Sequence, residues 1–137
     1  MTTKLFLAAP LAFMFAAAPA SAEVVKNPEA GTFQAAIVDS LKLLKDNKFD
    51  DWIRKYCSKE KLCFNQNSER DLKRYNLPAK SRRAAACLRE DGAGIDIQRV
   101  EDISETEKKV FLNCEKTAMP VPFYVVNEGG KWLFSSI

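Results

Sequence analysis

Four cysteines are the side chains in this sequence with the most definite chemistry. They are Cys57, Cys63, Cys87 and Cys114, and the chain contains no histidine. A thiol oxidoreductase requires a C-x-x-C motif at a helix start, whereas the closest pair here encloses five residues. A four-cysteine zinc site usually brings its ligands in two tight pairs, but Cys87 and Cys114 are far apart in the sequence. These spacings predict two structural disulfides, with no metal and no cofactor.

Three pairings of the four cysteines are possible, and their positions favour one of them. We predict Cys57–Cys63 because a short loop at a helix end can bring the two Cα atoms within bridging range. We predict Cys87–Cys114 because this bond would join an alanine-rich helix to the sheet that follows it. The long link contributes roughly 3–4 kcal/mol and the short one roughly 2–2.5 kcal/mol in the loop-entropy model. Loss of the longer link should therefore matter most for folding.

The residue types exclude several classes of enzyme site. Without histidine the Ser-His-Asp and Cys-His arrangements cannot form, and the sequence has no glycine-rich phosphate loop. Asp50 and Asp51 are adjacent, so their side chains diverge by about 100° on a helix, and we interpret them as first-turn acids that favour the helix dipole. Carboxylate or tyrosine acid–base chemistry in a cavity remains as the catalytic alternative. The sequence therefore favours a binding role over catalysis.

The charge distribution distinguishes the middle of the chain from its ends. The whole chain carries 21 basic and 18 acidic residues, but residues 54–89 hold eleven Lys and Arg against three Asp and Glu. One interpretation is a solvated helical face, and the other is a patch for an anionic envelope component such as lipid headgroups. No basic–aromatic motif indicates nucleic acid. The candidate patch comprises Arg70, Lys73, Arg74, Lys80, Arg82, Arg83 and Arg89.

The first 22 residues have the three-part layout of a secretory signal peptide. A basic start precedes an apolar run, and Ala20-Ser21-Ala22 forms a small-residue cleavage site. A permanent membrane anchor is the alternative, but Pro10 interrupts the apolar run and no stop-transfer charge cluster follows. We therefore expect residues 1–22 to be removed. Residues 23–137 should form one exported domain, periplasmic or secreted, that is not integral to the membrane.

Two amphipathic helices are predicted at the start of the mature chain. The first begins at Asn27, a candidate N-cap followed by proline, unless Gly31 delays the helix until Thr32. The second begins near Phe49, after a short break in the apolar pattern. Both need an apolar surface to pack on. Their apolar positions are Phe33, Ile37, Leu41, Leu44, Phe49, Trp52, Ile53, Tyr56 and Cys57.

Two further helices are predicted in the basic middle of the chain. One begins near Ser68, with Leu72 and Tyr75 as its apolar positions, and ends at Leu77-Pro78. Pro78 then begins the alanine-rich helix in its first turn, where a missing N–H is tolerated. The glycine-containing segment 91–94 ends that helix.

After residue 94 the apolar period changes from near 3.6 to near 2, which predicts strands. Ile95, Ile97 and Ile103 mark a first strand that is rich in charge, hence half exposed or at a sheet edge. After a turn, a second strand runs over residues 109–115, with Val110, Leu112 and Cys114 on one face.

The last 18 residues predict a β-hairpin. Two apolar runs flank Asn127-Glu128-Gly129-Gly130, where both glycines can adopt positive φ. Such a hairpin is apolar on both faces and requires cover from the rest of the chain. Because helices come first and strands afterwards, we predict an α+β fold with the helices packed on an antiparallel sheet of about four strands.

Three features of the chain carry a resemblance to a known family. They are the opening helix with Phe33 and Ile37, the Lys48-Phe49-Asp50 start of the second helix, and the closing hairpin with Gly130-Lys131-Trp132. This combination is similar to that of the NTF2-like (cystatin-like α+β) superfamily, particularly its small exported members of unknown function. The resemblance implies a curved sheet wrapped around helices, with a pocket at the open end. Enzymes of that family commonly use an Asp/His or Asp/Tyr pair in the pocket.

We expect a non-enzymatic exported domain that binds a small ligand or a protein partner between sheet and helices. The alternatives are an enzyme with carboxylate or tyrosine acid–base chemistry in an NTF2-like cavity, and an envelope-associated protein that acts through its basic helical face. No catalytic residue is assigned. The candidate ligand-binding side chains, each of which also suits a core position, are Trp52, Tyr56, Phe111, Tyr124, Trp132 and Phe134.

Overall fold

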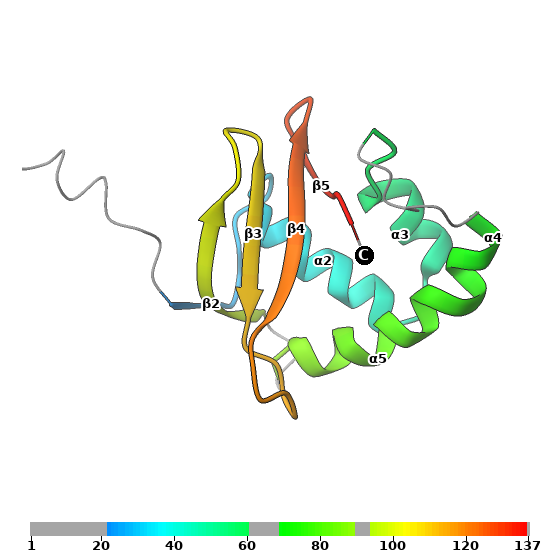
Figure 1. The fold of residues 1–137 in the computed structure, drawn as a ribbon, viewed down its shortest axis with the longest axis horizontal. Coiled ribbons are helices and arrows are strands. Elements are labelled where there is room, and N and C mark those ends of the chain that lie inside the picture. Colours follow the sequence, from blue (N-terminus) through cyan, green and yellow to red (C-terminus); the bar gives the residue numbers. More distant parts are fainter. Residues whose placement is uncertain (1–21, 61–68, 90–93, 137) are drawn as a thin grey trace, which may run out of the picture.

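Apart from the short strand β1, the helices of this chain precede its strands, as the sequence predicts. The structure, a computed structural model, describes residues 22–60, 69–89 and 94–136. A layer of helices packs on one face of an antiparallel sheet, so the fold is α+β (Figure 1). The elements are β1 (Glu23–Val25), α2 (Phe33–Lys45), α3 (Phe49–Tyr56), α4 (Glu69–Asp71), a π-helical segment (Leu72–Asn76), α5 (Leu77–Cys87), β2 (Ile95–Asp102), β3 (Glu107–Leu112), β4 (Val121–Glu128) and β5 (Lys131–Phe134).

The sheet is a meander of five strands in the order β1-β2-β3-β4-β5. Strands β2 to β5 correspond to the predicted strands, but β3 ends at Leu112, so the predicted extension of that strand to residue 115 is wrong. Strand β1 is an addition, because three residues are too few to show a period. Strand β1 pairs with residues 95–97 of β2. Ile95 and Ile97 are fully buried, whereas Arg99, Glu101 and Asp102 of the same strand are exposed, so the prediction of a half-exposed strand is confirmed. Ile103 lies beyond β2 and is 52% exposed, so it does not mark a strand.

A glycine at position 94 lets β1 lie close to the start of β2. Gly94 has a φ of +106°, and a Cβ atom there would lie 1.8 Å from the carbonyl oxygen of Val25. Any other residue would collide with β1 and would also strain the backbone. The prediction that segment 91–94 ends the alanine-rich helix falls partly outside the described residues, and α5 itself ends at Cys87.

The closing hairpin is confirmed. Asn127 pairs with Trp132 and Glu128 with Lys131, so Gly129 and Gly130 form a two-residue loop between β4 and β5. Both glycines have positive φ, and the Asn127 side-chain oxygen accepts a hydrogen bond from the Gly130 N–H. Positive φ at both central positions matches the right-handed twist of the strands.

The first long helix begins at Phe33, not next to Asn27. Gly31 has a φ of +89°, which no helical residue can adopt, so the chain becomes helical only after it. Thr32 is the N-cap, and its hydroxyl oxygen accepts a hydrogen bond from the Ala35 N–H at 3.2 Å. The N-cap predicted at Asn27 is therefore wrong, and the alternative of a delayed start is confirmed.

The two helices predicted in the basic middle follow each other without a gap from Glu69 to Cys87, so the predicted break is wrong. The α-helix α5 does begin at Leu77 with Pro78 in its first turn, as predicted. A π-helical segment precedes the proline, and the Leu77 N–H bonds to the Leu72 carbonyl five residues back. The wider π turn places Leu72 and Leu77 on the same side, and both are fully buried. Tyr75, predicted as an apolar position of this helix, is turned outward and is 63% exposed.

The core lies between the helix layer and the inner face of the sheet. Trp52 of α3 is fully buried, and its indole N–H donates a hydrogen bond to the Ser40 hydroxyl. Its ring meets that of Phe134 edge to face, with centroids 5.8 Å apart. Val110 and Leu112 of β3 alternate into the same layer, as predicted, and are fully buried.

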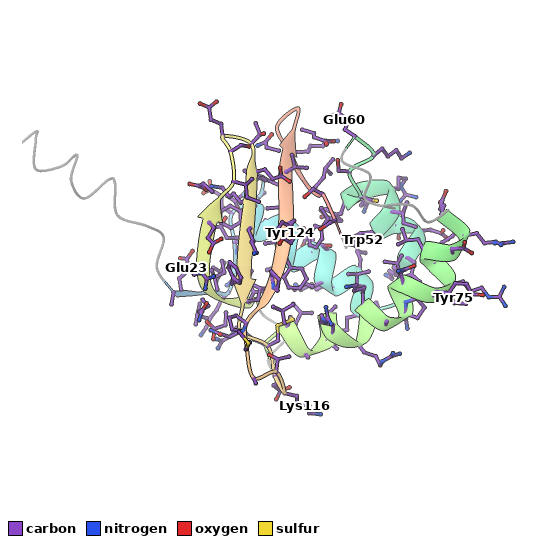
Figure 2. The ribbon with its side chains drawn as sticks, in the orientation of Figure 1. Glu23, Trp52, Glu60, Tyr75, Lys116 and Tyr124 are labelled. Carbon is purple, nitrogen blue, oxygen red and sulfur yellow. A yellow bond between two sulfur atoms is a disulfide. The ribbon has the colours of Figure 1, made fainter. Side chains whose placement is uncertain are left out.

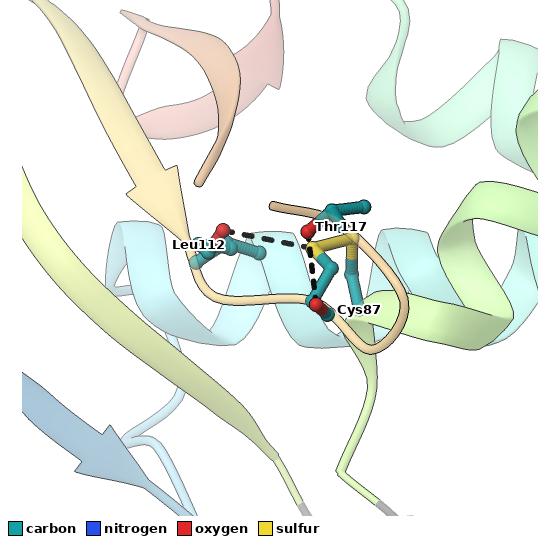
Figure 3. The surroundings of a disulfide bond; sticks show 4 residues. Cys87, Leu112 and Thr117 are labelled. Carbon is teal, nitrogen blue, oxygen red and sulfur yellow. Dashed lines mark hydrogen bonds between the residues drawn. A yellow bond between two sulfur atoms is a disulfide. The ribbon is translucent and has the colours of Figure 1, made fainter. Parts of the chain in front are cut away.

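A disulfide joins Cys87 at the end of α5 to Cys114 in the segment after β3, so this predicted pairing is confirmed (Figure 3). Hydrogen bonds hold the same junction, because the Glu115 N–H donates to the Ala86 carbonyl at 2.8 Å. Cys57 is also disulfide-bonded, but its predicted partner Cys63 lies outside the described residues. The confirmed bond ties the helix layer to the sheet.

The predicted signal peptide cannot be compared with the fold, because all but the last of its 22 residues lie outside the described part of the chain. Among the residues that the structure does describe, no helix has both the length and the apolar character needed to cross a bilayer.

Candidate ligand-binding pocket

The six aromatic side chains predicted to bind a ligand do not meet in one place. Trp52 is enclosed in the core (Figure 2), and Phe134 is only 2% exposed. Phe111 lies on the outer face of the sheet, where the Arg99 guanidinium stacks over its ring at 3.7 Å. The remaining three divide between two hollows. Tyr56 and Trp132 border an open groove, and Tyr124 joins Phe134 at an apolar pocket.

The apolar pocket lies between α2, α5 and one end of β4, with a volume of about 230 Å³. It exists because β5 is only four residues long and pairs with residues 125–128 of β4. Among the described residues, no strand pairs with the free side of residues 121–123. The helices approach this side without closing it. The lining residues are Leu41, Leu44, Lys80, Arg83, Ala84, Val121, Pro122, Phe123, Tyr124, Phe134 and Ser136.

Two cations from α5 line this otherwise apolar pocket. Lys80 and Arg83 are three residues apart and so lie on the same side of the helix. Within the described ranges neither forms a hydrogen bond or an ion pair, although Lys80 is half-buried. Burial lowers the pKa of Lys80, and the positive charge of Arg83 lowers it further. Two unmatched positive charges beside apolar walls favour a ligand that carries a negative charge.

Small residues make room for the pocket. Ala84 is 1% exposed and lies on the pocket wall between the two layers, where a larger side chain would fill the space. On the sheet side, Phe123 stacks edge to face against Phe134 at 5.9 Å. Neither Ala84 nor Phe123 was predicted from the sequence as a pocket residue. One sequence signal could have indicated the pocket. Lys80 and Arg83 are three residues apart in an alanine-rich helix, which places two cations on one side of the helix next to the small residue Ala84.

The open groove is larger, about 740 Å³, and two of its polar side chains, Tyr56 and Arg54, already have protein partners, while Lys55 and Lys131 are exposed to solvent. The Tyr56 hydroxyl donates a hydrogen bond to Asp39 at 3.3 Å, and Arg54 pairs with Asp51 at 2.6 Å. Burial, together with the charge and hydrogen bond of Asp39, raises the pKa of Tyr56 to about 12. This phenol therefore keeps its proton at neutral pH, which makes it a poor general base.

The predicted basic patch separates into three parts. Lys73 forms an ion pair with Asp50 at 2.8 Å, so Asp50 and its neighbour Asp51 act as matched first-turn acids of α3, as predicted. Arg89 lines a separate polar hollow beside the disulfide. The other members lie on α5 and on the helical segments before it, and two of them, Lys80 and Arg83, line the apolar pocket. Arg70, Arg74 and Arg82 are exposed on the outside.

Within residues 22–60, 69–89 and 94–136, no group of three or more cysteine, aspartate or glutamate side chains is placed to hold a metal ion. The pocket instead offers apolar contact and positive charge. Comparison with known proteins adds no assignment: no family model, no curated protein and no solved structure matches this chain.

Proposed function

We propose that this protein is an exported binding domain that takes a small amphipathic anion into the pocket between α2, α5 and β4. One observation carries the proposal: Lys80 and Arg83 line an apolar pocket without a protein partner in the described ranges. A carboxylate or similar anionic head would match these charges, while its apolar body would contact the aromatic wall. In the free protein, water must solvate these two cations inside the pocket.

The size of the pocket limits the ligand. A volume of about 230 Å³ lies below the usual range of drug-sized ligand sites, which begins at about 300 Å³. At roughly 30 Å³ per non-hydrogen atom, the value for liquid water, it holds about eight such atoms. Suitable ligands are therefore short carboxylates of the size of hexanoate, or aromatic acids of the size of benzoate. The rings of Phe123 and Phe134 can contact either the alkyl chain of hexanoate or the ring of benzoate.

Two features support the exported setting within this proposal. Ala20-Ser21-Ala22 is a typical cleavage site for a secretory signal, and Cys87–Cys114 is a disulfide of the kind that persists in oxidising compartments. The NTF2-like resemblance belongs to the proposal as well. Its support is the layer of helices on an antiparallel sheet, with a pocket between the two.

The test is a binding measurement with charged and neutral probes of equal size. Hexanoate and benzoate should bind the disulfide-intact protein, whereas hexanol, which lacks the charge, should bind at least about tenfold more weakly. The variant Lys80→Gln should weaken hexanoate binding and leave hexanol binding unchanged. Lys42→Gln, an exposed lysine on α2, removes the same charge away from the pocket and serves as the matched control. Equal binding of hexanoate and hexanol would disprove the proposal.

A further inference from the structure

The helical run from Glu69 to Cys87 presents positive charge on its outer side. From Leu72 to Arg89 every charged residue is basic. Lys73 is matched by an acid of α3, and two other cations face the apolar pocket. The exposed cations that remain, Arg74 and Arg82, point to solvent.

Two alanines lie on the outer surface of the same helical run. Ala79 and Ala85 are exposed, and their short side chains allow a flat partner to approach the helix closely. Tyr75 extends from the end of this surface, away from the interior of the fold (Figure 2). The Arg74 guanidinium lies over the Tyr75 ring, 5.4 Å from its centroid. An exposed aromatic ring next to a cation suits a boundary between apolar and charged surroundings.

The loop between β3 and β4 projects beyond the end of α5 (Figure 1). The disulfide and the hydrogen bond from Glu115 to Ala86 hold this loop against the helix end. Lys116 lies near its tip (Figure 2), and Met119 is 76% exposed. One large apolar side chain is thus exposed near each end of a positively charged surface. The acids at its borders are Glu69, Asp71 and Glu115.

We propose that this docking face binds the surface of a lipid bilayer that contains anionic phospholipid. Its cations would contact lipid phosphates, and Tyr75 and Met119 would enter the interfacial region, where aromatic and apolar side chains gain by leaving water. The docking face comprises Arg74, Tyr75, Ala79, Arg82, Lys116 and Met119. This inference does not depend on the proposed ligand, because Lys80 and Arg83 are not part of the docking face.

The exposed apolar side chains favour a bilayer over a soluble polyanion. A polyanion such as heparin attracts cations but offers Tyr75 and Met119 no apolar phase, so their removal would not change its binding. An anionic bilayer binds the cations through its phosphates and also provides an apolar phase for Tyr75 and Met119. The two partners therefore differ in their response to the loss of Tyr75 and Met119.

Sedimentation of the full mature chain with vesicles tests the proposal. The protein should bind phosphatidylcholine vesicles that contain phosphatidylglycerol, and should not bind pure phosphatidylcholine. Raising the salt concentration across the physiological range should weaken binding about tenfold. The variants Arg74→Gln with Arg82→Gln, and Tyr75→Gln with Met119→Gln, should each weaken vesicle binding by a similar factor. All four side chains are exposed, so circular dichroism should show an unchanged fold.

The matched control is Lys55→Gln with Lys131→Gln, which removes two exposed charges beside the open groove. Its vesicle binding should equal that of the unchanged protein. A loss as large as that of Arg74→Gln with Arg82→Gln would mean that net charge alone drives binding, which would overturn the docking face. Heparin binding that matches vesicle binding, with no effect of Tyr75→Gln and Met119→Gln, would identify a soluble polyanion and also overturn it.

Discussion

The two hollows that share α2 as a wall differ in how their charges are matched. In the open groove Tyr56 donates to Asp39, and Arg54 is paired with Asp51. In the apolar pocket Lys80 and Arg83 have no such partner in the described part of the chain. The groove is the larger of the two, yet its half-buried Tyr56 is satisfied within the protein, and its unpaired cations Lys55 and Lys131 are exposed to solvent. A half-buried unmatched charge beside an apolar wall, as at Lys80, therefore identifies a binding site better than volume does.

The largest effect is expected from removal of the disulfide that holds one wall of the pocket to the sheet. The double variant Cys87→Ala with Cys114→Ala should lose about 3–4 kcal/mol in the free energy of unfolding, since the bond closes a loop of 27 residues. Urea unfolding measures this loss. An unchanged unfolding midpoint would show that the hydrogen bonds of the loop suffice to hold α5 on the sheet.

The next effect comes from filling the pocket. Ala84→Leu should weaken hexanoate binding about tenfold, or about 1.4 kcal/mol, because the larger side chain occupies the space of the ligand. Ala85→Leu changes the neighbouring exposed residue in the same way and is the matched control. If both variants bind hexanoate equally well, the ligand lies elsewhere.

The groove should show a smaller effect at high pH. The pKa of Tyr56 is raised from 10.0 to about 12, so the folded protein holds this proton more tightly than the unfolded chain. The resulting stabilisation is complete below pH 10 and is lost as the pH rises from 10 to 12. Because Tyr56 is partly exposed, the loss should be about 1 kcal/mol. Absorbance of phenolate should show a tyrosine that ionises near pH 12 and is missing in Tyr56→Phe.

The smallest effect concerns the stability cost of the unmatched lysine. Burial lowers the pKa of Lys80, so its charge disfavours the folded state wherever the lysine is protonated. Lys80→Met should therefore raise the free energy of unfolding at neutral pH by about 0.5 kcal/mol while it weakens hexanoate binding. Tyr56→Phe should have the opposite sign and destabilise, because Asp39 loses its donor. Chemical denaturation of both variants measures this contrast.

The sequence predicted the parts of the fold that have strong local signals. The hairpin follows from two glycines between apolar runs, and α3 follows from the spacing of Phe49, Trp52 and Ile53. The Cys87–Cys114 bond was predicted because it joins a helix to the sheet. In contrast, β1 has three residues and forms only because β2 offers it a pairing edge.

The site was harder to predict than the fold. Periodicity places Tyr124 and Phe134 near sheet and helices, and both line the pocket, but it cannot show where β5 stops pairing. That end leaves part of β4 free and creates the pocket. The outward position of Tyr75 was missed for a similar reason, since a π turn shifts the phase of the helix and follows from packing around Pro78.

The most direct test of the unmatched-charge account is the pKa of Lys80 with and without hexanoate. This pKa is measured from the NMR shift of the side-chain carbon next to the amine as the pH is varied. The free protein should show a pKa below the ordinary 10.5, and hexanoate should raise it because the carboxylate stabilises the ammonium. Hexanol should not raise it. A Lys80 pKa that is the same in the free protein and with saturating hexanoate would contradict the account.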